Sequence, residues 1–168
     1  TSLVMNIIEH VAVDQGQPCA VFSLEMSAEQ LVQRLLCSRA HVSMANLNNG
    51  FIQNDRFIHL THVASEIANA PIHIDDTPSL PIGEFRAKAR RLHQRHGIKL
   101  IAIDYLQLMR STSKRAQENR QIEIAEISSG LKATAKELNI PIIVLAQLNR
   151  SPESRTGDSK GRPRLSDL

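Results

Sequence analysis

The chain has 168 residues, a hydrophobic fraction of 42% and a formal net charge of +3, so it permits a polyanionic partner without requiring one. This length is enough for one globular domain with a sizeable core, and no apolar run is long enough to cross a membrane. Aromatic residues make up only 3% of the chain, which disfavours an aromatic platform for stacking single-stranded bases. Cys19 and Cys37 lack CxxC spacing, and we expect both to be reduced core thiols.

Helical periodicity and short apolar runs alternate along the chain. The spacing of apolar residues predicts a first helix over 1–13, and Ser27 is suited to cap a second helix. Further helices are expected over 54–68, 82–96 and 120–138, and apolar runs occupy 18–24, 71–76, 99–105 and 141–147. The last helix contains Gly130, which costs up to about 1 kcal/mol relative to alanine in a helix.

The four apolar runs have the character of strands that are buried on both faces. They are apolar throughout rather than alternating, and helices separate them, which is typical of a parallel sheet covered by helices on both sides. The sequence therefore predicts an α/β fold, a three-layer sandwich with a mainly parallel sheet. Two polar segments, 110–119 and 151–164, are expected to be mobile loops.

Polar residues end all four apolar runs. Glu25, Asp104 and Gln147 each follow one run, and Asp75 and Asp76 follow another. The carboxyl ends of parallel strands meet at one crevice, where ligands bind. An aspartate there suits the shell of Mg²⁺, a glutamate can polarise an attacking water, and a glutamine can bind a terminal phosphate oxygen. We expect one aspartate of the Asp75–Asp76 pair to cap the following turn or to support the site by a hydrogen bond.

A phosphate cradle is missing from this nucleotide-hydrolysis pattern. Such a cradle is a glycine-rich loop that closes in GK[ST] before a helix. The first predicted helix opens with Thr1, the residue type that ends such a loop. We therefore expect the cradle to lie directly upstream of Thr1.

Several segments of the chain resemble the C-terminal motor domain of the DnaB-type replicative helicases. They are FSLEMSAEQLVQRLL, IDDTPS, IDYLQLM, ENRQIEIAEISSGLKATAKELNIPIIVLAQLNR and RPRLSDL, and together they extend over essentially the whole chain in the family's order. The resemblance implies a RecA-like P-loop ATPase core and a cytoplasmic ring homohexamer that moves along single-stranded DNA using ATP and Mg²⁺. It also implies primase and a helicase loader as partners, and no association with a membrane.

The resemblance assigns roles to individual residues. Thr1 and Asp104 are expected to bind Mg²⁺. Glu25 is expected to be the catalytic carboxylate that activates water, and Gln147 is expected to contact the γ-phosphate and to take part in catalysis. The residues expected around ATP are Thr1, Ser2, Arg34, Asp104 and Gln147.

The chain also departs from the family pattern. We expect residues 1–168 to form a partial RecA-like domain that starts at the end of the Walker A motif. It is expected to stop before the main DNA-binding loop and before the arginine finger that a neighbouring subunit supplies. The longer parent protein would then be the ATP-dependent helicase, and the fragment alone would be inactive.

Basic side chains gather in two polar loops that leave the predicted sheet edge. Contacts with DNA phosphates provide affinity without reading sequence, as a helicase requires. Solvated charged loops without DNA contact remain an open alternative for both segments. The candidate DNA-binding residues are Arg110, Lys114, Arg115, Arg150, Arg155, Arg162 and Arg164.

Two other functions and one other kind of site fit parts of the sequence. The chain could belong to another RecA-like ATPase, such as a recombinase or a ring ATPase, or it could be a non-catalytic fragment of the same fold. The motifs SLEMS and IDYLQL favour the helicase, and an upstream helical domain would favour it further. The pairs His59/His62 and His93/His96 lack the cysteine or carboxylate partners of a metal site, so we expect them to lie on solvated helix faces.

Overall fold

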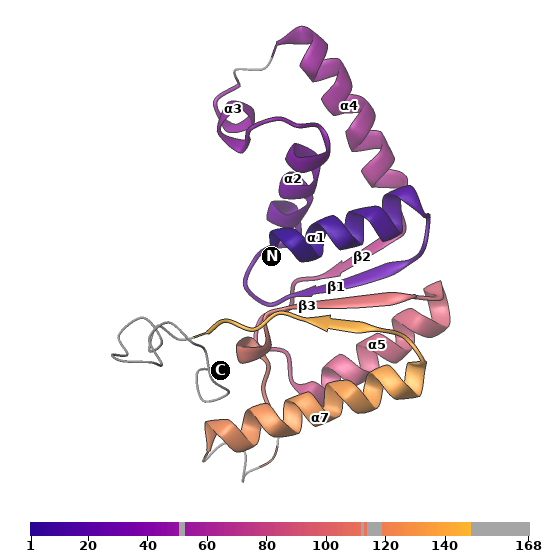
Figure 1. Ribbon diagram of the computed structural model, residues 1–168, viewed down its shortest axis with the longest axis vertical. Coiled ribbons are helices and arrows are strands. Elements are labelled where there is room, and N and C mark those ends of the chain that lie inside the picture. The colour runs from indigo at the N-terminus through magenta and orange to yellow at the C-terminus, as the bar shows by residue number, and fades with distance from the viewer. Residues whose placement is uncertain (51–52, 112, 114–118, 149–168) are drawn as a thin grey trace, which may run out of the picture.

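A four-stranded parallel sheet lies between two layers of helices in the computed structural model, which describes residues 1–50, 53–111, 113 and 119–148 (Figure 1). The strands lie in the order β2-β1-β3-β4, and every neighbouring pair is parallel. Their bounds are β1 (Cys19–Ser23), β2 (Ile72–Asp75), β3 (Leu100–Asp104) and β4 (Ile142–Val144). The predicted α/β three-layer architecture with a parallel sheet is confirmed.

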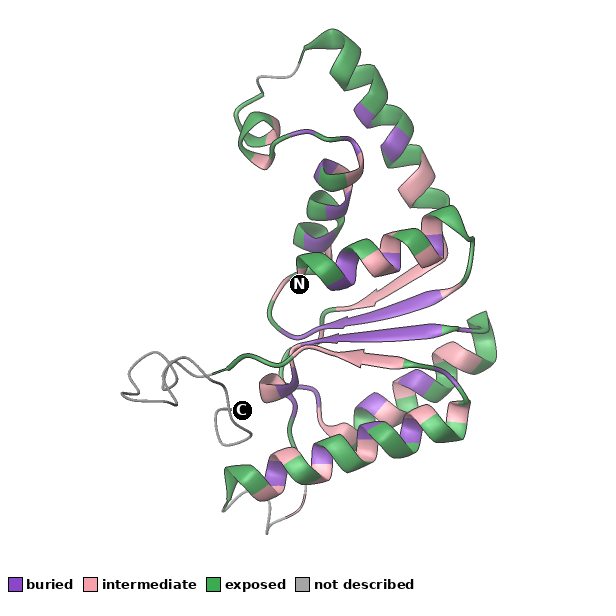
Figure 2. Cartoon of the chain, viewed as in Figure 1, coloured by how far each residue is buried: buried purple, intermediate pink, exposed green. Residues whose placement is uncertain are grey.

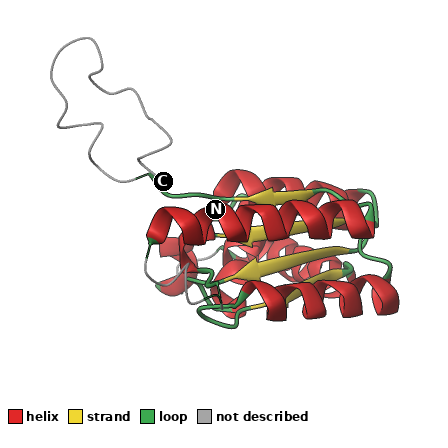
Figure 3. Cartoon of the chain, turned by 90° about the horizontal axis from the view of Figure 1, so that it is seen from below, coloured by secondary structure: helices red, strands yellow, loops and turns green. Residues whose placement is uncertain are grey.

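Helices cover both faces of the sheet (Figure 3). One layer holds α1 (Ser2–Glu9), its π-helical continuation η1 (His10–Asp14), α2 (Ala28–Arg39), α3 (Met44–Asn48) and α4 (Asn54–Asn69). The other holds α5 (Ile82–His96) and α7 (Arg120–Leu138), and a short 3₁₀ turn, η2 (Leu106–Leu108), follows β3. The long helices agree with the sequence, whereas α3 and η2 were not expected. In the described part of the chain, no helix has the length and apolar character needed to cross a membrane.

The two central strands are buried along their whole length (Figure 2). In β1, Cys19 and Val21 pack with α1 and α2, whereas Ala20 and Phe22 pack in the larger core against α5 and α7. Strand β3 alternates in the same way. Because helices cover both faces, both sets of side chains must be apolar, which explains why these runs do not alternate with polar residues.

Both cysteines are free thiols inside the described core, as the sequence predicted. Cys19 lies in β1 with no exposed surface, and burial raises the pKa of its thiol to about 11. Burial also raises the pKa of Cys37. Both side chains therefore stay protonated at neutral pH and act as small apolar groups.

The start of α2 is held by two separate caps. The Ser27 hydroxyl accepts a hydrogen bond from the Gln30 backbone N–H at 3.3 Å, and the Gln30 side chain accepts one from the Ser27 N–H at 3.3 Å. This capping box confirms Ser27 as the predicted cap. The Asp76 carboxylate accepts a third hydrogen bond, from the Ala28 N–H at 3.0 Å. The chain after β2 is thereby tied to the helix that follows β1.

Gly130 permits a close approach between α7 and the start of α5. A Cβ atom at this position would lie 2.7 Å from Cγ1 of Ile82, closer than real side chains pack. We expect Gly130→Ala to lower the free energy of unfolding by about 1 kcal/mol, because overpacking outweighs the gain in helix propensity. Gly83→Ala is the matched control, since nothing lies within 4 Å of its Cβ, and it should be neutral or stabilising. Chemical denaturation measures both, and a stabilised Gly130→Ala variant would contradict the packing argument.

Candidate functional site

The carboxyl ends of β1, β3 and β4 lie side by side. Ser23 and Asp104 are register partners at the ends of β1 and β3. The chain continues this pairing beyond the strands, because the Leu24 N–H donates to the Asp104 carbonyl at 2.8 Å. On the other side of β3, the Leu145 N–H donates to the Ile103 carbonyl at 2.9 Å. The sheet therefore brings the chain segments carrying Glu25, Asp104 and Gln147 to one edge, as predicted.

Thr1 lies at the same edge, and its hydroxyl donates a hydrogen bond of 2.6 Å to Oδ2 of Asp104. The two residues are 103 positions apart in sequence. Thr1 is half-buried at the N-terminus of α1, and Asp104 is only 8% exposed. The contact joins a hydroxyl oxygen and a carboxylate, the donor types that a hard divalent cation prefers. Both atoms fit the coordination shell of Mg²⁺ in chemical type.

Ser23 supports the turn that carries Glu25, and the sequence analysis missed it. It is 1% exposed, its hydroxyl donates to the Met26 carbonyl at 2.6 Å, and it accepts from the Met26 N–H at 3.3 Å. These two bonds close the turn that carries the exposed Glu25 away from the strand. A serine directly before a strand-end turn is a known local signal for such a bond, and it could have identified Ser23.

A pocket of about 400 Å³ lies beside the N-terminus of α1. It is lined by Thr1, Ser2 and Arg34, together with residues of α1, α2 and α3. One wall is made by Cys37, whose thiol lies 3.8 Å from the sulfur of Met44. The structure thus brings together three of the residues that the resemblance assigns to ATP binding.

Gln147 is held through its backbone by the side chain of Gln107. The Gln147 N–H donates to Oε1 of Gln107 at 3.1 Å, and Nε2 of Gln107 donates to the Gln147 carbonyl at 2.6 Å. Gln147 is exposed and lies three residues beyond the end of β4. No local sequence signal marks Gln107 as its partner, because the two residues lie 40 positions apart.

The polar ending of β2 has a structural role. The Asp75 carboxylate accepts from the Thr77 N–H at 3.1 Å, and the Lys88 ammonium donates to it at 2.8 Å. Burial would raise the pKa of Asp75, but the hydrogen bonds from Lys88 and Thr77 outweigh it and hold this pKa below its ordinary value. The expectation that one aspartate of this pair caps the following turn is confirmed for Asp75.

Most of the candidate DNA-binding residues lie outside the part of the chain that the structure describes. Arg110 is described, is exposed, and is held through its backbone by the Leu80 carbonyl and the Ile82 N–H. The expected mobile loops 110–119 and 151–164 also fall largely outside the described residues. The other candidates, all outside it, are Lys114, Arg115, Arg150, Arg155, Arg162 and Arg164.

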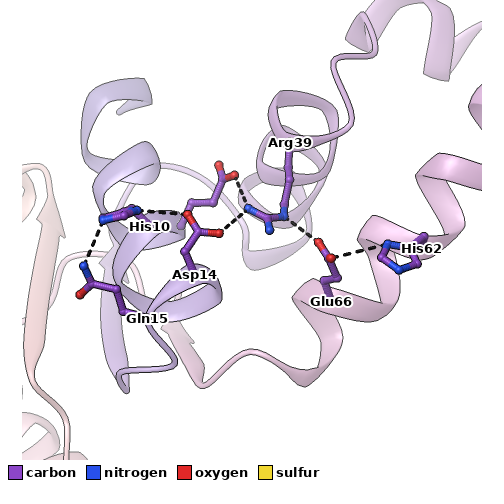
Figure 4. Close-up of polar contacts among 7 residues, drawn as sticks. His10, Asp14, Gln15, Arg39, His62 and Glu66 are labelled. Atoms are coloured by element: carbon purple, nitrogen blue, oxygen red, sulfur yellow. Dashed lines mark hydrogen bonds and ion pairs between the residues drawn. The ribbon is translucent and has the colours of Figure 1, made fainter.

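A second polar cluster surrounds Arg39 at the C-terminal end of α1 (Figure 4). The Arg39 guanidinium forms ion pairs with Glu9 at 3.1 Å, Asp14 at 3.0 Å and Glu66 at 2.8 Å. The cavity beside it, about 770 Å³, is larger than the pocket at Thr1 but is lined by none of the predicted nucleotide residues. The cluster ties α1, α2 and α4 together, so its role is structural.

Neither of the two histidine pairs forms a metal site in the described part of the chain. His62 is exposed and lies 3.5 Å from the Glu66 carboxylate. His93 is half-buried, and its Nδ1–H donates to the Ile98 carbonyl at 3.0 Å. His93 therefore does not lie on the fully solvated helix face that the sequence analysis expected. Within the described ranges, no group of three or more histidine, cysteine, aspartate or glutamate side chains could hold a metal ion.

The cluster around Arg39 predicts a loss of stability in acid. Hydrogen bonds from His10 and Arg39 hold the pKa of Asp14 below its ordinary value, and a hydrogen bond from Arg39 does the same for Glu66. The folded chain therefore protonates the Asp14 and Glu66 carboxylates less readily than the unfolded chain does. The stabilisation from these two carboxylates is complete above about pH 5, where the carboxyl groups of the unfolded chain are ionised. It is lost as the pH falls through the lowered pKa values that Asp14 and Glu66 have in the folded chain.

Thermal unfolding measured between pH 3 and pH 7 tests this prediction. Arg39→Met is expected to lower Tm at pH 7 and to flatten the dependence of Tm on pH. Arg56→Met, an exposed arginine on α4 and the matched control, should leave the profile unchanged. Equal slopes for Arg39→Met and the unchanged protein would contradict the linkage.

Comparison with known proteins identifies the family. The family model described as the DnaB-like helicase C terminal domain matches residues 1–168. A replicative DNA helicase DnaB of Geobacillus stearothermophilus is 46% identical over 168 residues, which are all of this chain and 36% of that protein. The replicative DNA helicase DnaB of Mycobacterium leprae (strain TN) is 44% identical over all of this chain and 27% of its own length. The chain thus spans about a third of these curated relatives.

Solved structures agree with this match. A DnaB-like replicative helicase, described with its interactions with primase, has a TM-score of 0.79 at 29% identity over 93% of this chain and 38% of its own. A second solved structure, described as an ATPase domain, has a TM-score of 0.79 at 28% identity over 93% of this chain and 55% of its own. The RecA-like core implied by the resemblance is confirmed. The chain belongs to the DnaB-like helicase C-terminal domain family.

Proposed function

We propose that the protein carrying this chain is an ATP-driven replicative DNA helicase that translocates on single-stranded DNA as a ring hexamer and unwinds duplex at the replication fork. The observation that carries the proposal is the 2.6 Å hydrogen bond from Thr1 to Asp104, because it joins the two residues that the family resemblance assigns to Mg²⁺. The pocket that Thr1 shares with Ser2 and Arg34 supports it further. Family membership favours the helicase over a recombinase or a non-catalytic fragment.

Thr1 and Asp104 would hold Mg²⁺ together with the phosphates of ATP. Their hydroxyl and carboxylate oxygens suit this ion, and the buried Asp104 supplies a negative charge in surroundings where charge interactions are strong. Bound Mg²⁺ would neutralise the charge that develops on the transferred phosphate. The N-terminus of α1, where Thr1 and Ser2 lie, adds backbone donors that favour phosphate oxygens.

Glu25, Gln147 and Arg34 would complete the chemistry. Glu25 stands on the turn closed by Ser23 and would accept a proton from the attacking water as general base. The amide of Gln147 would hydrogen-bond a γ-phosphate oxygen and so distinguish ATP from ADP. Arg34 would contact the nucleotide from the wall of the pocket that it shares with Thr1.

The proposed partners follow from the family. Single-stranded DNA is the proposed track, and phosphate contacts would bind it without regard to sequence. The protein would assemble as a homohexamer and bind primase and a helicase loader in the cytoplasm. The contact with primase is supported by the similar DnaB-like helicase whose structure is described with its interactions with primase. The proposed DNA-binding residues are Arg110, Lys114, Arg115, Arg150, Arg155, Arg162 and Arg164.

Glu25→Gln tests the proposal in the protein as its gene encodes it. ATP turnover stimulated by single-stranded DNA is expected to fall about 100- to 10,000-fold, because glutamine cannot accept the proton of the attacking water. ATP affinity should stay within a few-fold of the unchanged protein, since the side chain keeps its shape. Phosphate release and nucleotide titration measure the two quantities.

Glu29→Gln is the matched control, because Glu29 is an exposed glutamate in the first turn of α2, four residues along the chain. It should leave turnover unchanged. The proposal is rejected if the unchanged protein hydrolyses no ATP with DNA present, or if Glu25→Gln turns over at the normal rate.

A further inference from the structure

A continuous chain of hydrogen bonds runs from the end of β4 to the start of α7. It begins at the two-point contact between the Gln107 side chain and the Gln147 backbone, at 3.1 and 2.6 Å. The Gln107 carbonyl then accepts a hydrogen bond from Nη2 of Arg120 at 2.7 Å. Gln107 therefore contacts the end of β4 through its side chain and the start of α7 through its backbone.

The same chain continues to the segment that leaves β3. The other amino group of Arg120 donates to the Glu123 carboxylate, which is 7% exposed. Oε1 of Glu123 accepts from the Ser111 N–H at 3.1 Å, and the neighbouring Glu126 accepts from the Ser111 hydroxyl at 2.7 Å. Ser111 lies directly after Arg110, the described candidate for DNA contact. The end of β4 and the exit from β3 are thus linked through one arginine.

The link contains a buried charge, the Glu123 carboxylate. Burial would raise the pKa of Glu123, but the Ser111 N–H and Arg120 outweigh burial and hold this pKa below its ordinary value, so the carboxylate is ionised. An ionised buried carboxylate must keep its partners, because an unpaired charge in the interior is costly. A displacement of Gln147 acts first on the Gln107 side chain, and the Gln107 carbonyl and Arg120 connect that residue to Glu123 and so to the Ser111 N–H.

We propose that Gln107, Arg120 and Glu123 are positioning residues that couple the segment after β4, which carries Gln147, to the chain that leaves β3 through Arg110 and Ser111. The coupling rests on the proposed function: it links occupation of the γ-phosphate position to the grip on single-stranded DNA. Such coupling is reciprocal, so DNA binding at one end also changes nucleotide affinity at the other. None of the three residues lines the pocket at Thr1, so each acts through its neighbours.

Arg120→Lys and Gln107→Met test the link with little change in volume. Lysine keeps the charge but cannot donate to Glu123 and to the Gln107 carbonyl with one planar fork. Methionine fills the space of Gln107 without either hydrogen bond to Gln147. In the full protein, Arg120→Lys is expected to keep the ATPase rate measured without DNA, because Arg120 does not line the pocket at Thr1. Gln107→Met is compared with it through the ratio of the rates measured with and without DNA. Both should reduce the stimulation by single-stranded DNA, and the difference in DNA affinity between ATP-analogue and ADP states, at least about fivefold.

Arg90→Lys is the matched control. Arg90, on α5, donates two hydrogen bonds to the carboxylate of Glu137, at 2.5 and 2.8 Å, and Glu137 lies near the other end of α7. It should leave the stimulation by DNA unchanged. Stimulation within about twofold of normal in both Arg120→Lys and Gln107→Met overturns the coupling.

Amide hydrogen exchange separates failure of the link from failure of the proposed function. Gln107→Met is expected to speed exchange of the Ser111 amide as well as of the Gln147 amide, because the link is continuous. Faster exchange of the Gln147 amide alone overturns the coupling, whatever ATPase rate is measured. An unchanged protein with no ATPase rejects the helicase function and the role in DNA coupling together, while the exchange result still decides whether the link exists.

Discussion

Asp104→Asn is expected to lower ATP turnover by the full-length protein about 100- to 1,000-fold while leaving its fold intact. Asparagine keeps an oxygen that can accept the 2.6 Å hydrogen bond from Thr1, so the sheet edge need not rearrange. What it removes is the negative charge, in a position that is only 8% exposed. Oxygen ligands without charge hold Mg²⁺ poorly, so the Mg²⁺ concentration needed for half-maximal turnover should rise as well.

Turnover measured as a function of Mg²⁺ concentration, together with Tm, tests this expectation. Asp55→Asn is the matched control, because Asp55 is an exposed aspartate in the first turn of α4. It should change neither quantity. An Asp104→Asn protein with normal turnover and a normal requirement for Mg²⁺ would remove Asp104 from the metal site. A large fall in Tm would instead assign it a role in the fold.

Phe22→Ala is expected to lower the free energy of unfolding by about 3–5 kcal/mol. Phe22 has no exposed surface, and its ring lies edge-on to that of Phe85 with 4.9 Å between ring centroids. It lies in the core that joins the sheet to α5 and α7. Truncation would leave a cavity between these layers, because a close-packed interior relaxes only partly. The loss is a large fraction of the roughly 5–15 kcal/mol that stabilises a typical domain.

Chemical denaturation of Phe22→Ala and of the unchanged protein measures this loss, and Phe57→Ala is the matched control. Phe57 lies on α4 and is 58% exposed, so its removal should change the unfolding free energy by no more than about 0.5 kcal/mol. A double-mutant cycle with Phe85→Ala should give a coupling energy that differs from zero, since the rings touch. A loss of less than about 1 kcal/mol for Phe22→Ala would mean that the two helices hold their places without this ring.

The sequence predicted the alternation of helices and buried strands, but local patterns missed α3 and η2 and overestimated the length of β4. Helix α3 has no buried residue of its own, so it leaves no apolar periodicity for a pattern to detect. Strand β4 is only three residues long although its apolar run is longer, because pairing with β3 ends at Val144. The boundary of a strand depends on its neighbour, which the run itself does not contain.

The candidate site divides in the same way. Glu25, Asp104 and Gln147 could be proposed as site residues because each follows an apolar run, and Thr1, Ser2 and Arg34 because they match the family. Ser23 was not predicted, because it lies inside the apolar run 18–24. Gln107 and Arg120 carried no signal, because their roles depend on partners at the ends of other elements.

The sequence by itself determined where the long helices and the four buried runs lie and which polar residues follow the runs, because apolar periodicity and capping are properties of neighbouring residues. Only the tertiary structure decided the order β2-β1-β3-β4 and the contacts across it. These contacts join Thr1 to Asp104 and Gln107 to Gln147, across 103 and 40 positions of chain. Burial of both sheet faces brings such distant residues together and sets the register of the strands. The sequence around one partner therefore gives no local signal for the other.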